Sequence, residues 1–552
     1  MKKIMLQAIK ERKLQLFFLI YILLVIPLVS PIAQNVPARY LIANIFVNAG
    51  LLAVLFLLFF FMTSKTEKVI ASLLLFITLV PGVIFLAYLL FAHVLLFEDS
   101  IISLFETNPE ESKEFVAYYL SPWVLLGVGI YAVIPIILIC KMKRTKRLSV
   151  WKHKYLFLGC MTILFFSLSI ERIAKSIYFV NFYRIFFEYK MRTAIEDKAI
   201  KERQTVPFAV TTTNSELKTI IVIIGESETR HHMSLYGYNR PTNPLLSKES
   251  DLLVYKDVIS PQVHTIPVIR SVMSFADKKN PDYIITRPSL FELFNRAGYE
   301  TYFISNQPFG GNYRTSYDNL LEQAQHIKNL SLRKKPDEVI LEPLKKILTQ
   351  PLVRSQLIVI HLIGSHMAYE FRYPVAFNVF NHRKDGKVKS GAPYLTDGAK
   401  TTIDRYDNTV LYNDSILAEA IELLKKRENP LLVYFSDHGE EVYDYRDFAG
   451  HAYEKITTPM CEIPFLVWIP DNYRRSRGDL CFDINRPYST DDFIYSLSDL
   501  AGLRYDGYDD SRSLFSYTFK ERERLVGDLS YESVIELTNR LAASSGHLHT
   551  GQ

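Results

Sequence analysis

The stretch TIIVIIGESETRHH, residues 219–232, decides the fold of this chain. Its run of Ile and Val from Ile220 to Ile224 is typical of a strand buried on both faces, as in a parallel sheet covered by helices. Directly after Gly225 comes Glu226, an ionisable side chain at the mouth of that strand. A carboxylate in this place needs an explanation, and the rest of the chain supplies one.

Further apolar runs of the same kind follow in the second half of the chain and alternate with helical patterns. The predicted strands are 219–224, 300–304, 356–361, 431–435 and 463–468, and the helical patterns lie near 266–276, 287–297, 338–349 and 403–427. Such alternation predicts an α/β fold in which a mostly parallel sheet is flanked by helices. In these sheets, functional sites form beyond the carboxyl ends of the strands.

Polar residues follow three of the predicted strands where each strand ends. Glu226 follows the first strand, His366 comes after the 356–361 strand, and Asp437 and His438 come after the 431–435 strand. A set of one Glu, one Asp and one His suits Zn²⁺ or Mn²⁺. Any one of these residues alone is better explained as part of a surface loop or as a satisfied polar contact, but together they predict a metal site.

A candidate nucleophile lies in SPQVHTIPVIRSVMSF, residues 260–275. Pro267 allows a helix to begin just before it, which places Thr265 at or near the N-cap. Backbone N–H groups and the positive end of the helix dipole then surround the Thr265 hydroxyl. A plain helix cap is the alternative explanation for this residue.

The first 170 residues hold most of the apolar excess of a chain that is 49% hydrophobic overall. Five apolar stretches there are each about long enough to cross a bilayer core of roughly 30 Å. They lie near 14–33, 40–62, 69–91, 118–140 and 155–171. No cleavage signal follows the first stretch. The sequence therefore predicts an integral membrane protein with a five-helix membrane domain.

Lys and Arg in the short loops predict the orientation of these spans. Residues 1–13, 63–68 and 141–154 carry fourteen of them, whereas 34–39 and 98–117 carry one each. The side with fourteen is cytoplasmic, so five spans place everything after about residue 172 outside the cytoplasm. The formal net charge of +6 is thus a topology signal and indicates no nucleic-acid partner.

The predicted domains are 1–171 in the membrane, a bridging helix at 172–204, an external domain at 205–541 and a disordered tail at 542–552. Residues 171–204 mix aromatic and charged residues at helical spacing. This suits either an amphipathic helix at the membrane surface or an ordinary core-packing helix. A disulfide between Cys461 and Cys481 is chemically permitted outside the cytoplasm, but Cys461 equally fits as a small buried hydrophobic residue.

Several longer motifs resemble, in order and spacing, those of the phosphoethanolamine transferases. The motifs are GESETRHHMSLYGYNRPTNP (225–244), HTIPVIRSVMSFADKKNP (264–281), HLIGSHMAYEFRYP (361–374), YDNTVLYNDSIL (406–417), SDHGEE (436–441) and GHAYE (450–454). Members of that family are membrane enzymes whose catalytic domain is alkaline-phosphatase/sulfatase-like. The resemblance spans nearly the whole chain, although SDHGE alone marks only the wider superfamily.

The resemblance implies site residues, a cofactor and partners. Glu226, Thr265, Asp437 and His438 match the zinc ligands, and Thr265 is also the nucleophile. His366 and His451 match histidines that contact the transferred phosphoryl group or an additional zinc. The implied donor is phosphatidylethanolamine, and the implied acceptor is lipopolysaccharide, at a core heptose or at lipid A. The enzyme is expected to act as a monomer in the bacterial inner membrane, with its catalytic domain in the periplasm.

Two further regions are expected to bind substrate. Ser103, Thr107 and Glu111 recur every four residues and so share one helix face; the matching family segment helps to hold the ethanolamine head group, although an acidic solvated face also explains the segment. Asn306 and Gln307 follow the 300–304 strand at the same sheet edge, where ordinary loop polarity is the alternative.

Other functions remain open at this stage. A glycerol-phosphate transferase or a membrane-anchored phosphodiesterase would use the same metal site with a different head group or with water. A sulfatase is disfavoured because its nucleophile is a modified Cys or Ser, and Thr265 cannot become formylglycine. The complete set of motif residues argues against a non-catalytic scaffold. Two external cysteines permit at most one disulfide, which, with the 264–281 motif, favours the subgroup that modifies the lipopolysaccharide core.

Overall fold

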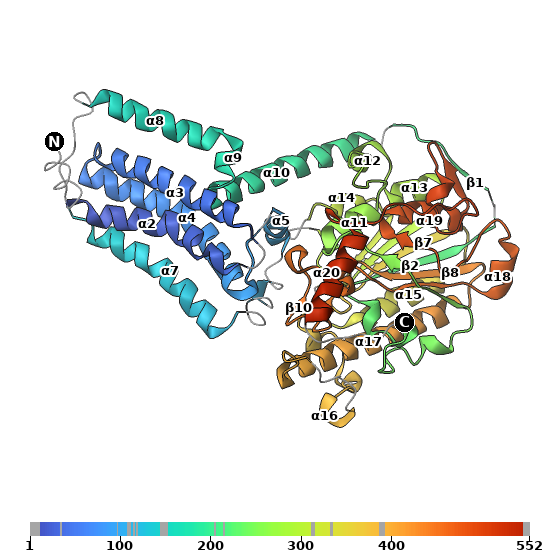
Figure 1. Ribbon diagram of the computed structural model, residues 1–552. Helices are drawn as coiled ribbons and strands as arrows, with labels where there is room; N and C mark the ends of the chain where they lie inside the picture. The colour runs from blue at the N-terminus through green and yellow to red at the C-terminus, as the bar shows by residue number, and fades with distance from the viewer. Residues whose placement is uncertain are drawn as a thin grey trace. The chain divides into compact units, whose positions relative to one another are not determined.

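The computed structural model describes residues 11–544, except 34–35, 97, 108–111, 114–115, 117–119, 144–152, 204–205, 214–215, 311–314, 332–334 and 386–391. The chain forms two compact units, Met1–Arg192 and Thr193–Gln552 (Figure 1). The first unit is helical, and the second is built around a central sheet.

Four helices of the first unit are long and apolar enough to cross a membrane: α2 (Lys13–Val29), α3 (Ala38–Phe59), α4 (Ser64–Ala92) and α7 (Pro122–Lys141). The fifth predicted span is the apolar helix α8 (Lys154–Ser169). Its 16 residues measure about 24 Å, which is shorter than the bilayer core. Outward-facing apolar side chains such as Phe76 and Trp123, each 78% exposed, fit a surface that lipid covers. The first unit is therefore a multi-pass membrane domain.

The interior of this membrane domain is mostly apolar, and it includes a buried ion pair. Phe18, Leu51, Phe59, Leu86 and Tyr131 pack into one core cluster. Arg12 and Glu67 are each 1% exposed, and their charged atoms lie 3.0 Å apart. Because both groups are buried, loss of either one would leave an unpaired charge in the interior. The pair also links the start of α2 to the first turn of α4.

Short helices follow in the first unit, and one long helix leads out of it. They are α5 (Glu98–Glu106), α9 (Glu171–Ala174) and α10 (Tyr178–Arg203). The bridging segment predicted at 172–204 thus contains most of α9 and the whole of α10. Helix α10 begins in the first unit and ends in the second.

The second unit contains a seven-stranded sheet in the order β3-β11-β8-β2-β7-β5-β6. Its strands are β2 (Thr219–Gly225), β3 (Leu252–Tyr255), β5 (Glu300–Ser305), β6 (His326–Asn329), β7 (Gln356–His361), β8 (Pro430–Ser436) and β11 (Phe465–Trp468). Strand β2 pairs in parallel with β7 and β8, and β5 pairs in parallel with β7 and β6. Only β11 reverses direction, because it is antiparallel to both β8 and β3.

Helices cover both faces of this sheet (Figure 1). They are α11 (Thr265–Val272), α12 (Tyr283–Thr286), α13 (Leu290–Arg296), α14 (Asp318–Leu321), α15 (Leu341–Leu348), α17 (Asp397–Leu424), α18 (Asp471–Ser476) and α19 (Phe493–Ala501). The short helix α16 (His382–Asp385) lies against α17 instead. Side chains of α11, α13 and α19 build one core cluster with Ile220, Val222 and Ile224 of β2. Ile221 and Ile223 point the other way, into a second cluster with α15 and α17. Strand β2 is therefore buried on both faces, as its run of Ile and Val predicts.

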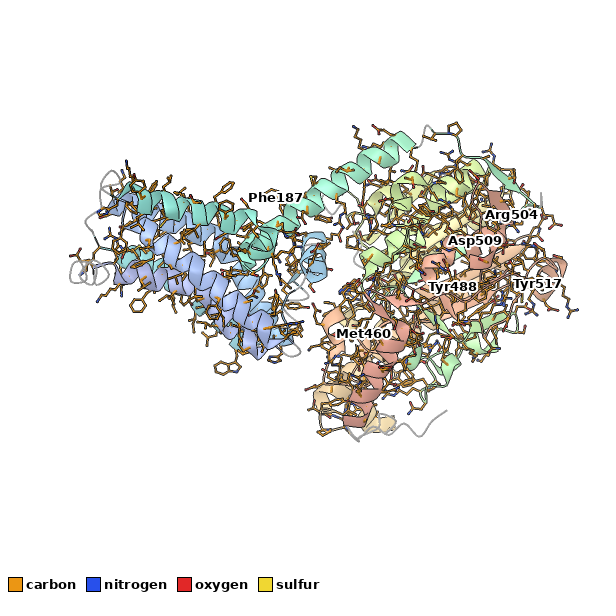
Figure 2. The ribbon with its side chains drawn as sticks, turned by 45° about the horizontal axis from the view of Figure 1, so that its top comes forward. Phe187, Met460, Tyr488, Arg504, Asp509 and Tyr517 are labelled. Carbon is orange, nitrogen blue, oxygen red and sulfur yellow. The ribbon has the colours of Figure 1, made fainter. Side chains whose placement is uncertain are left out.

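Short strand pairs and a last helix complete the second unit. The pairs are β1 (Val210–Thr212) with β13 (Leu503–Tyr505), β4 (Val258–Ile259) with β12 (Tyr488–Ser489), β9 (Glu441–Val442) with β10 (Ala449–Gly450) and β14 (Leu525–Val526) with β15 (Leu529–Ser530). Helix α20 (Tyr531–Ser544) packs Val534 against Met460 and Cys461 in a small apolar cluster. Figure 2 labels Met460, which is buried in this cluster, and Tyr517, which is exposed at the surface of the unit.

The predicted fold class is confirmed: the chain has a helical membrane domain and an α/β domain with a mostly parallel sheet. All five predicted strands are present. All four cysteines are free, so the disulfide between Cys461 and Cys481 does not form, and Cys461 is the small buried residue that was the alternative. Most of the tail predicted at 542–552 lies outside the described residues, although α20 continues to Ser544.

Candidate metal centre

Three acidic and imidazole side chains meet where the two central strands end. Glu226 directly follows β2, and Asp437 and His438 directly follow β8, its parallel neighbour. One ligand atom from each of the three lies within 4.8 Å of the others, and all three residues are buried. The sheet thus brings together residues that are more than 200 positions apart in the chain, as the sequence predicts.

The backbone around Glu226 is shaped to make this approach possible. Ser227 has φ 56°, a left-handed conformation that turns the chain sharply after the strand. Gly364, with φ 49°, lies so close that an added Cβ would come within 2.8 Å of the Glu226 backbone. Only glycine fits at that position, which explains the IGSH stretch that precedes His366.

Asp437 is oriented by the backbone and leaves one oxygen for a ligand. Its Oδ1 accepts hydrogen bonds from the backbone N–H groups of Ser227 at 3.1 Å and His438 at 2.7 Å. Its buried Oδ2 has no hydrogen-bond partner among the residues that the structure describes. An orphaned buried carboxylate oxygen is costly, and a bound cation would satisfy it.

Thr265 brings its hydroxyl to two of these three residues, Glu226 and His438. It is the first residue of α11, directly after His264 at the N-cap. Its Oγ1 lies 3.1 Å and 3.3 Å from the two Glu226 oxygens and 3.4 Å from His438 Nε2. The hydroxyl is therefore part of the cluster and also lies at the positive end of a helix dipole.

The electrostatics of the cluster call for a positive ion. Burial raises the pKa of Asp437 to about 8, and the charge of Glu226 adds to the effect. Burial opposes a charge on His438, but Asp437 and Glu226 together raise its pKa to about 10. His438 Nδ1 donates to the Gly439 carbonyl at 2.9 Å, so the extra proton stands on Nε2, which faces the carboxylates. A divalent metal ion at this point would replace that proton.

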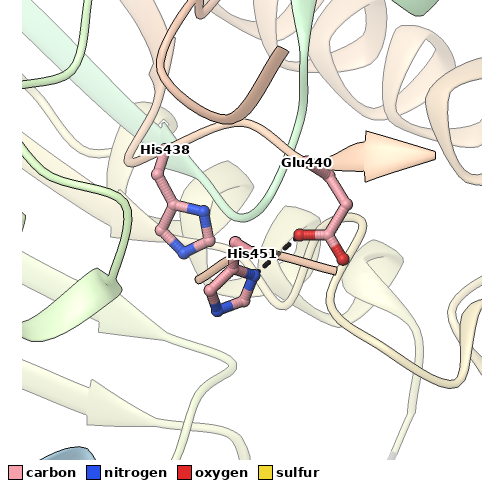
Figure 3. Close-up of side chains that lie close together, drawn as sticks. All are labelled: His438, Glu440 and His451. Carbon is pink, nitrogen blue, oxygen red and sulfur yellow. Dashed lines mark hydrogen bonds and ion pairs between the residues drawn. The ribbon is translucent and has the colours of Figure 1, made fainter. Parts of the chain in front are cut away.

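A second group of possible ligands lies beside the first (Figure 3). His438, Glu440 and His451 form it, and the rings of His438 and His451 are 4.2 Å apart. Glu440 Oε2 lies 2.7 Å from His451 Nδ1, and its Oε1 accepts a hydrogen bond from the Tyr369 hydroxyl at 2.8 Å. Burial lowers the pKa of His451 to about 3 and raises that of Glu440 to about 8. At neutral pH His451 is therefore a neutral imidazole, and Glu440 keeps its carboxyl proton.

Other residues predicted for the site have contacts of their own. Gln307 donates to Glu226 Oε2 at 2.7 Å and to the Leu362 carbonyl at 2.9 Å, so it orients a predicted metal ligand. Asn306 donates to Asp337 Oδ1 at 2.9 Å. His366 lies in the loop after β7, and its charge, with the larger effect of His438, helps to hold the pKa of Glu226 well below its usual range against the effect of burial.

The residues predicted to bind the head group belong to the membrane domain. Ser103 lies on α5, and the Thr107 hydroxyl donates to the Ser103 carbonyl at 2.7 Å. Glu111 lies outside the described residues. The role predicted for these three residues stays a prediction.

Sequence reasoning did not single out three side chains near the centre. The first is Glu440. Its position two residues after His438, within SDHGEE, could have marked it as part of the site. His361 ends β7, and burial lowers its pKa to about 4. His264 packs its ring 5.2 Å from that of His451. A lone histidine at a strand end or before a helix carries no clear signal in a single sequence.

Known proteins match both parts of the chain. Residues 218–503 match the family model described as Sulfatase. Phosphoethanolamine transferase EptC of Escherichia coli (strain K12) is 30% identical over 505 residues, which cover 85% of this chain and 86% of that protein. Phosphoethanolamine transferase CptA of Salmonella typhimurium is 30% identical over 470 residues, which cover 78% of this chain and 80% of that protein.

This chain belongs to the phosphoethanolamine transferase family.

Solved structures agree with the fold of this transferase. The C-terminal periplasmic domain of EcEptC from Escherichia coli, solved as a complex with Zn, is 34% identical, with a TM-score of 0.56 over 60% of this chain and 97% of that one. The integral membrane protein EptA from Neisseria meningitidis has a TM-score of 0.60 over 91% of this chain and 98% of that one. At 19% identity, the second match shows a shared fold for membrane and catalytic domains.

Part of the 225–244 motif of the transferase serves the fold. His232 is 2% exposed, and its Nδ1 lies 2.5 Å from Asp407 on α17. Arg240 bonds the other oxygen of Asp407 at 2.7 Å and reaches Asp404 at 2.6 Å. This buried ion network locks the segment after β2 onto α17, which explains why a basic and aromatic stretch follows the metal ligand.

Proposed function

We propose that this transferase moves phosphoethanolamine from phosphatidylethanolamine to lipopolysaccharide, with a core heptose as the first acceptor to test and lipid A as the second. The observation that carries the proposal is the place of the Thr265 hydroxyl, within 3.4 Å of both Glu226 and His438 and at a helix N-terminus. A hydroxyl in that position is ready to act as a nucleophile at a metal ion.

We assign the metal as Zn²⁺, held by Glu226, Thr265, Asp437 and His438. Support comes from the orphaned Asp437 Oδ2, from the mixed oxygen and nitrogen donors, and from the zinc complex of the related periplasmic domain. Bound zinc lowers the pKa of a coordinated hydroxyl and neutralises charge on phosphoryl oxygens. Gln307 holds Glu226 in place, and the Ser227 and His438 backbone amides hold Asp437.

The reaction proceeds in two halves. Thr265 would first lose its hydroxyl proton to water, as a bound zinc ion would favour. Its Oγ1 then bonds to the phosphorus of the donor, the bond from phosphorus to the diacylglycerol oxygen breaks, and phosphoethanolamine stays on the threonine. An acceptor hydroxyl or phosphate oxygen then displaces Thr265. The scheme is ping-pong, because diacylglycerol leaves before the acceptor reacts.

The Glu440–His451 pair supplies the proton for the leaving group. Since Glu440 holds its proton against His451 Nδ1, the neutral imidazole carries its own proton on Nε2 and can donate it to the departing diacylglycerol oxygen. Glu440 then returns a proton to Nδ1, and the pair works in reverse when the acceptor loses its proton. His366, after β7, is the second candidate for contact with the phosphoryl group.

The remaining parts of the proposal concern organisation. Ser103, Thr107 and Glu111 hold the ethanolamine group, with Glu111 opposite the ammonium. Residues 1–171 form the membrane domain, 172–204 the bridging helix and 205–541 the catalytic domain, which stands in the periplasm while the chain spans the bacterial inner membrane. The enzyme acts as a monomer.

Intact-protein mass spectrometry tests the first half directly. Wild type and Thr265→Ala, purified with metal, are incubated with phosphatidylethanolamine in detergent micelles. We expect a mass gain of one phosphoethanolamine group in wild type and none in the variant. No gain in folded, metal-loaded wild type would reject this donor. Phosphatidylglycerol in place of phosphatidylethanolamine then tests the glycerol-phosphate alternative, and release of diacylglycerol without an adduct would indicate a phosphodiesterase.

A further inference from the structure

Two cations flank His451 on one short segment. Arg446 lies between β9 and β10, the hairpin that leads from Glu440 to His451, and Lys455 ends the short helical turn Tyr453–Lys455 that follows. Arg446 donates to the Lys455 carbonyl at 2.6 Å. This hydrogen bond closes residues 446–455 into a loop, with both cations at its ends and His451 within it.

Neither cation has a carboxylate partner within 4 Å in the described part of the chain. Lys455 Nζ lies 4.4 Å from the centre of the Phe448 ring, and the recorded polar contact of the Arg446 side chain is the Lys455 carbonyl. Both residues are half-buried. Some half-buried arginines of this domain pair with carboxylates, such as Arg230 with Glu462 and Arg270 with Glu196. Arg446 does not, and in this it is like Arg486, which donates to backbone carbonyls.

The two positive charges also act on each other. Burial lowers the pKa of Lys455 to about 8; the nearby charge of Arg446 adds to this effect, and the charges of Asp447 and Glu454 oppose it. Burial lowers the pKa of Arg446 as well, and the charge of Glu441 opposes that effect. Two partly desolvated like charges cost folding free energy, and an anion between them would relieve that cost.

A guanidinium and an ammonium group on one short loop suit a phosphate group, which offers several acceptor oxygens and at least one negative charge. The donor head group is a poor match, because phosphatidylethanolamine carries its own ammonium group and has no net charge. A glycolipid acceptor with phosphorylated sugars carries uncompensated phosphates. The chemistry of the loop therefore favours the acceptor of the second half-reaction.

We propose that Arg446 and Lys455 form an anion site that holds a phosphate group of the acceptor glycolipid while the acceptor attacks the phosphoethanolamine on Thr265. The proposal rests on the two-step function given above. Because His451 lies on the same loop, an acceptor held by these cations is delivered beside the residue that takes its proton.

The two half-reactions test this site separately. The adduct on Thr265 is formed from phosphatidylethanolamine and then discharged with lipopolysaccharide, either intact or treated with phosphatase. For Lys455→Glu we expect discharge by intact lipopolysaccharide to slow by about tenfold or more, the effect of losing a charge-assisted contact. Adduct formation should stay within about twofold of wild type. With phosphatase-treated lipopolysaccharide, wild type and variant should discharge alike.

Two further variants separate charge from loop structure. Arg446→Lys keeps the charge and should discharge like wild type, whereas Arg446→Gln keeps a donor for the Lys455 carbonyl and should slow like Lys455→Glu. Lys345→Glu, on the exposed face of α15, changes the net charge equally and should have no effect. Normal discharge by Lys455→Glu would overturn the proposal, and so would an equal loss in both half-reactions.

Binding of inorganic phosphate tests the proposed anion site without requiring the enzyme to react. Titration calorimetry on the metal-loaded enzyme should show a phosphate site in wild type and Lys345→Glu that Lys455→Glu lacks. If wild type forms no adduct from phosphatidylethanolamine, the proposed function fails, yet this titration still decides the anion site. Identical phosphate isotherms for all three proteins would refute it.

Discussion

Thr265 Oγ1 and Glu226 Oε2 lie 3.1 Å apart, where the first turn of α11 meets the carboxyl end of β2. This contact joins the proposed nucleophile to a predicted metal ligand. It also answers the question raised by residues 219–232, since the carboxylate after the buried strand faces a hydroxyl and an imidazole rather than apolar side chains.

Replacing the nucleophile should abolish turnover without emptying the metal site. For Thr265→Ala we expect the rate of transfer to fall by at least about 10³-fold, because the hydroxyl that lies between Glu226 and His438 is lost. Thr265→Ser keeps a hydroxyl and should retain measurable adduct formation. Adduct mass and metal content are measured together, and a variant that lacks Thr265 yet still forms an adduct would show that the nucleophile is another residue.

Replacing Asp437 should make the thermal stability of the protein independent of bound metal. Since its free Oδ2 is the atom that a cation would satisfy, Asp437→Asn is expected to lose bound zinc. A ligand present at 100 times its Kd stabilises a protein by about 2.7 kcal/mol, so chelation should lower the Tm of wild type by a few degrees. The Tm of Asp437→Asn should not respond to chelator.

The role of Gln307 can be tested by comparing a variant of Gln307 with a variant of its neighbour Asn306. Gln307→Leu removes the donor that holds Glu226 Oε2 and should weaken zinc binding by about 10–100-fold, as expected when a group that orients a metal ligand is lost. Asn306→Ala, which disturbs the contact with Asp337, serves as the control. Competition with a zinc chelator measures the zinc affinity of each variant. Equal zinc affinities for Gln307→Leu and wild type would contradict this role.

The buried network of His232 predicts a pH dependence of folding stability. Burial opposes the charge of His232, but Asp444 and Asp407 raise its pKa to about 10 from 6.5. Since the folded state binds the proton more tightly, this contribution is complete below about pH 6.5 and is lost as the pH rises toward 10. The free energy of unfolding of wild type should therefore exceed that of His232→Gln by on the order of a few kcal/mol near pH 6, and by less near pH 10. Urea unfolding in detergent, with the exposed His326→Gln as control, measures the difference.

Elements with strong burial patterns were predictable, and half-exposed ones were not. Strands β2, β7 and β8 are buried along their whole length, so their apolar runs stand out. Strand β6, HIKN, is exposed throughout and has no apolar signal. The reversed direction of β11 follows from its pairing with β8 and β3, which no local pattern records.

The meeting of three predicted metal ligands was predictable from the sequence, and the contacts that support them were less so. Glu226, Asp437 and His438 stand at strand ends, where the topology of a parallel sheet makes them neighbours. The contact between Gln307 and Glu226 depends on the bend after β5, and the pairing of Glu440 with His451 depends on the β9–β10 hairpin. These contacts arise from tertiary structure, because the residues involved carry no spacing that marks them as partners.

The order of the sheet has a consequence for the maturation of the enzyme. Glu226 and His438 become neighbours only when β2 and β8 pair at the centre of the sheet, so an incompletely folded chain offers the metal no complete set of ligands. If Glu226 and His438 are ligands, we expect zinc loading to follow the folding of the catalytic domain, in the compartment where that folding finishes. The metal supply of that compartment, rather than that of the site of synthesis, would then set the fraction of active enzyme.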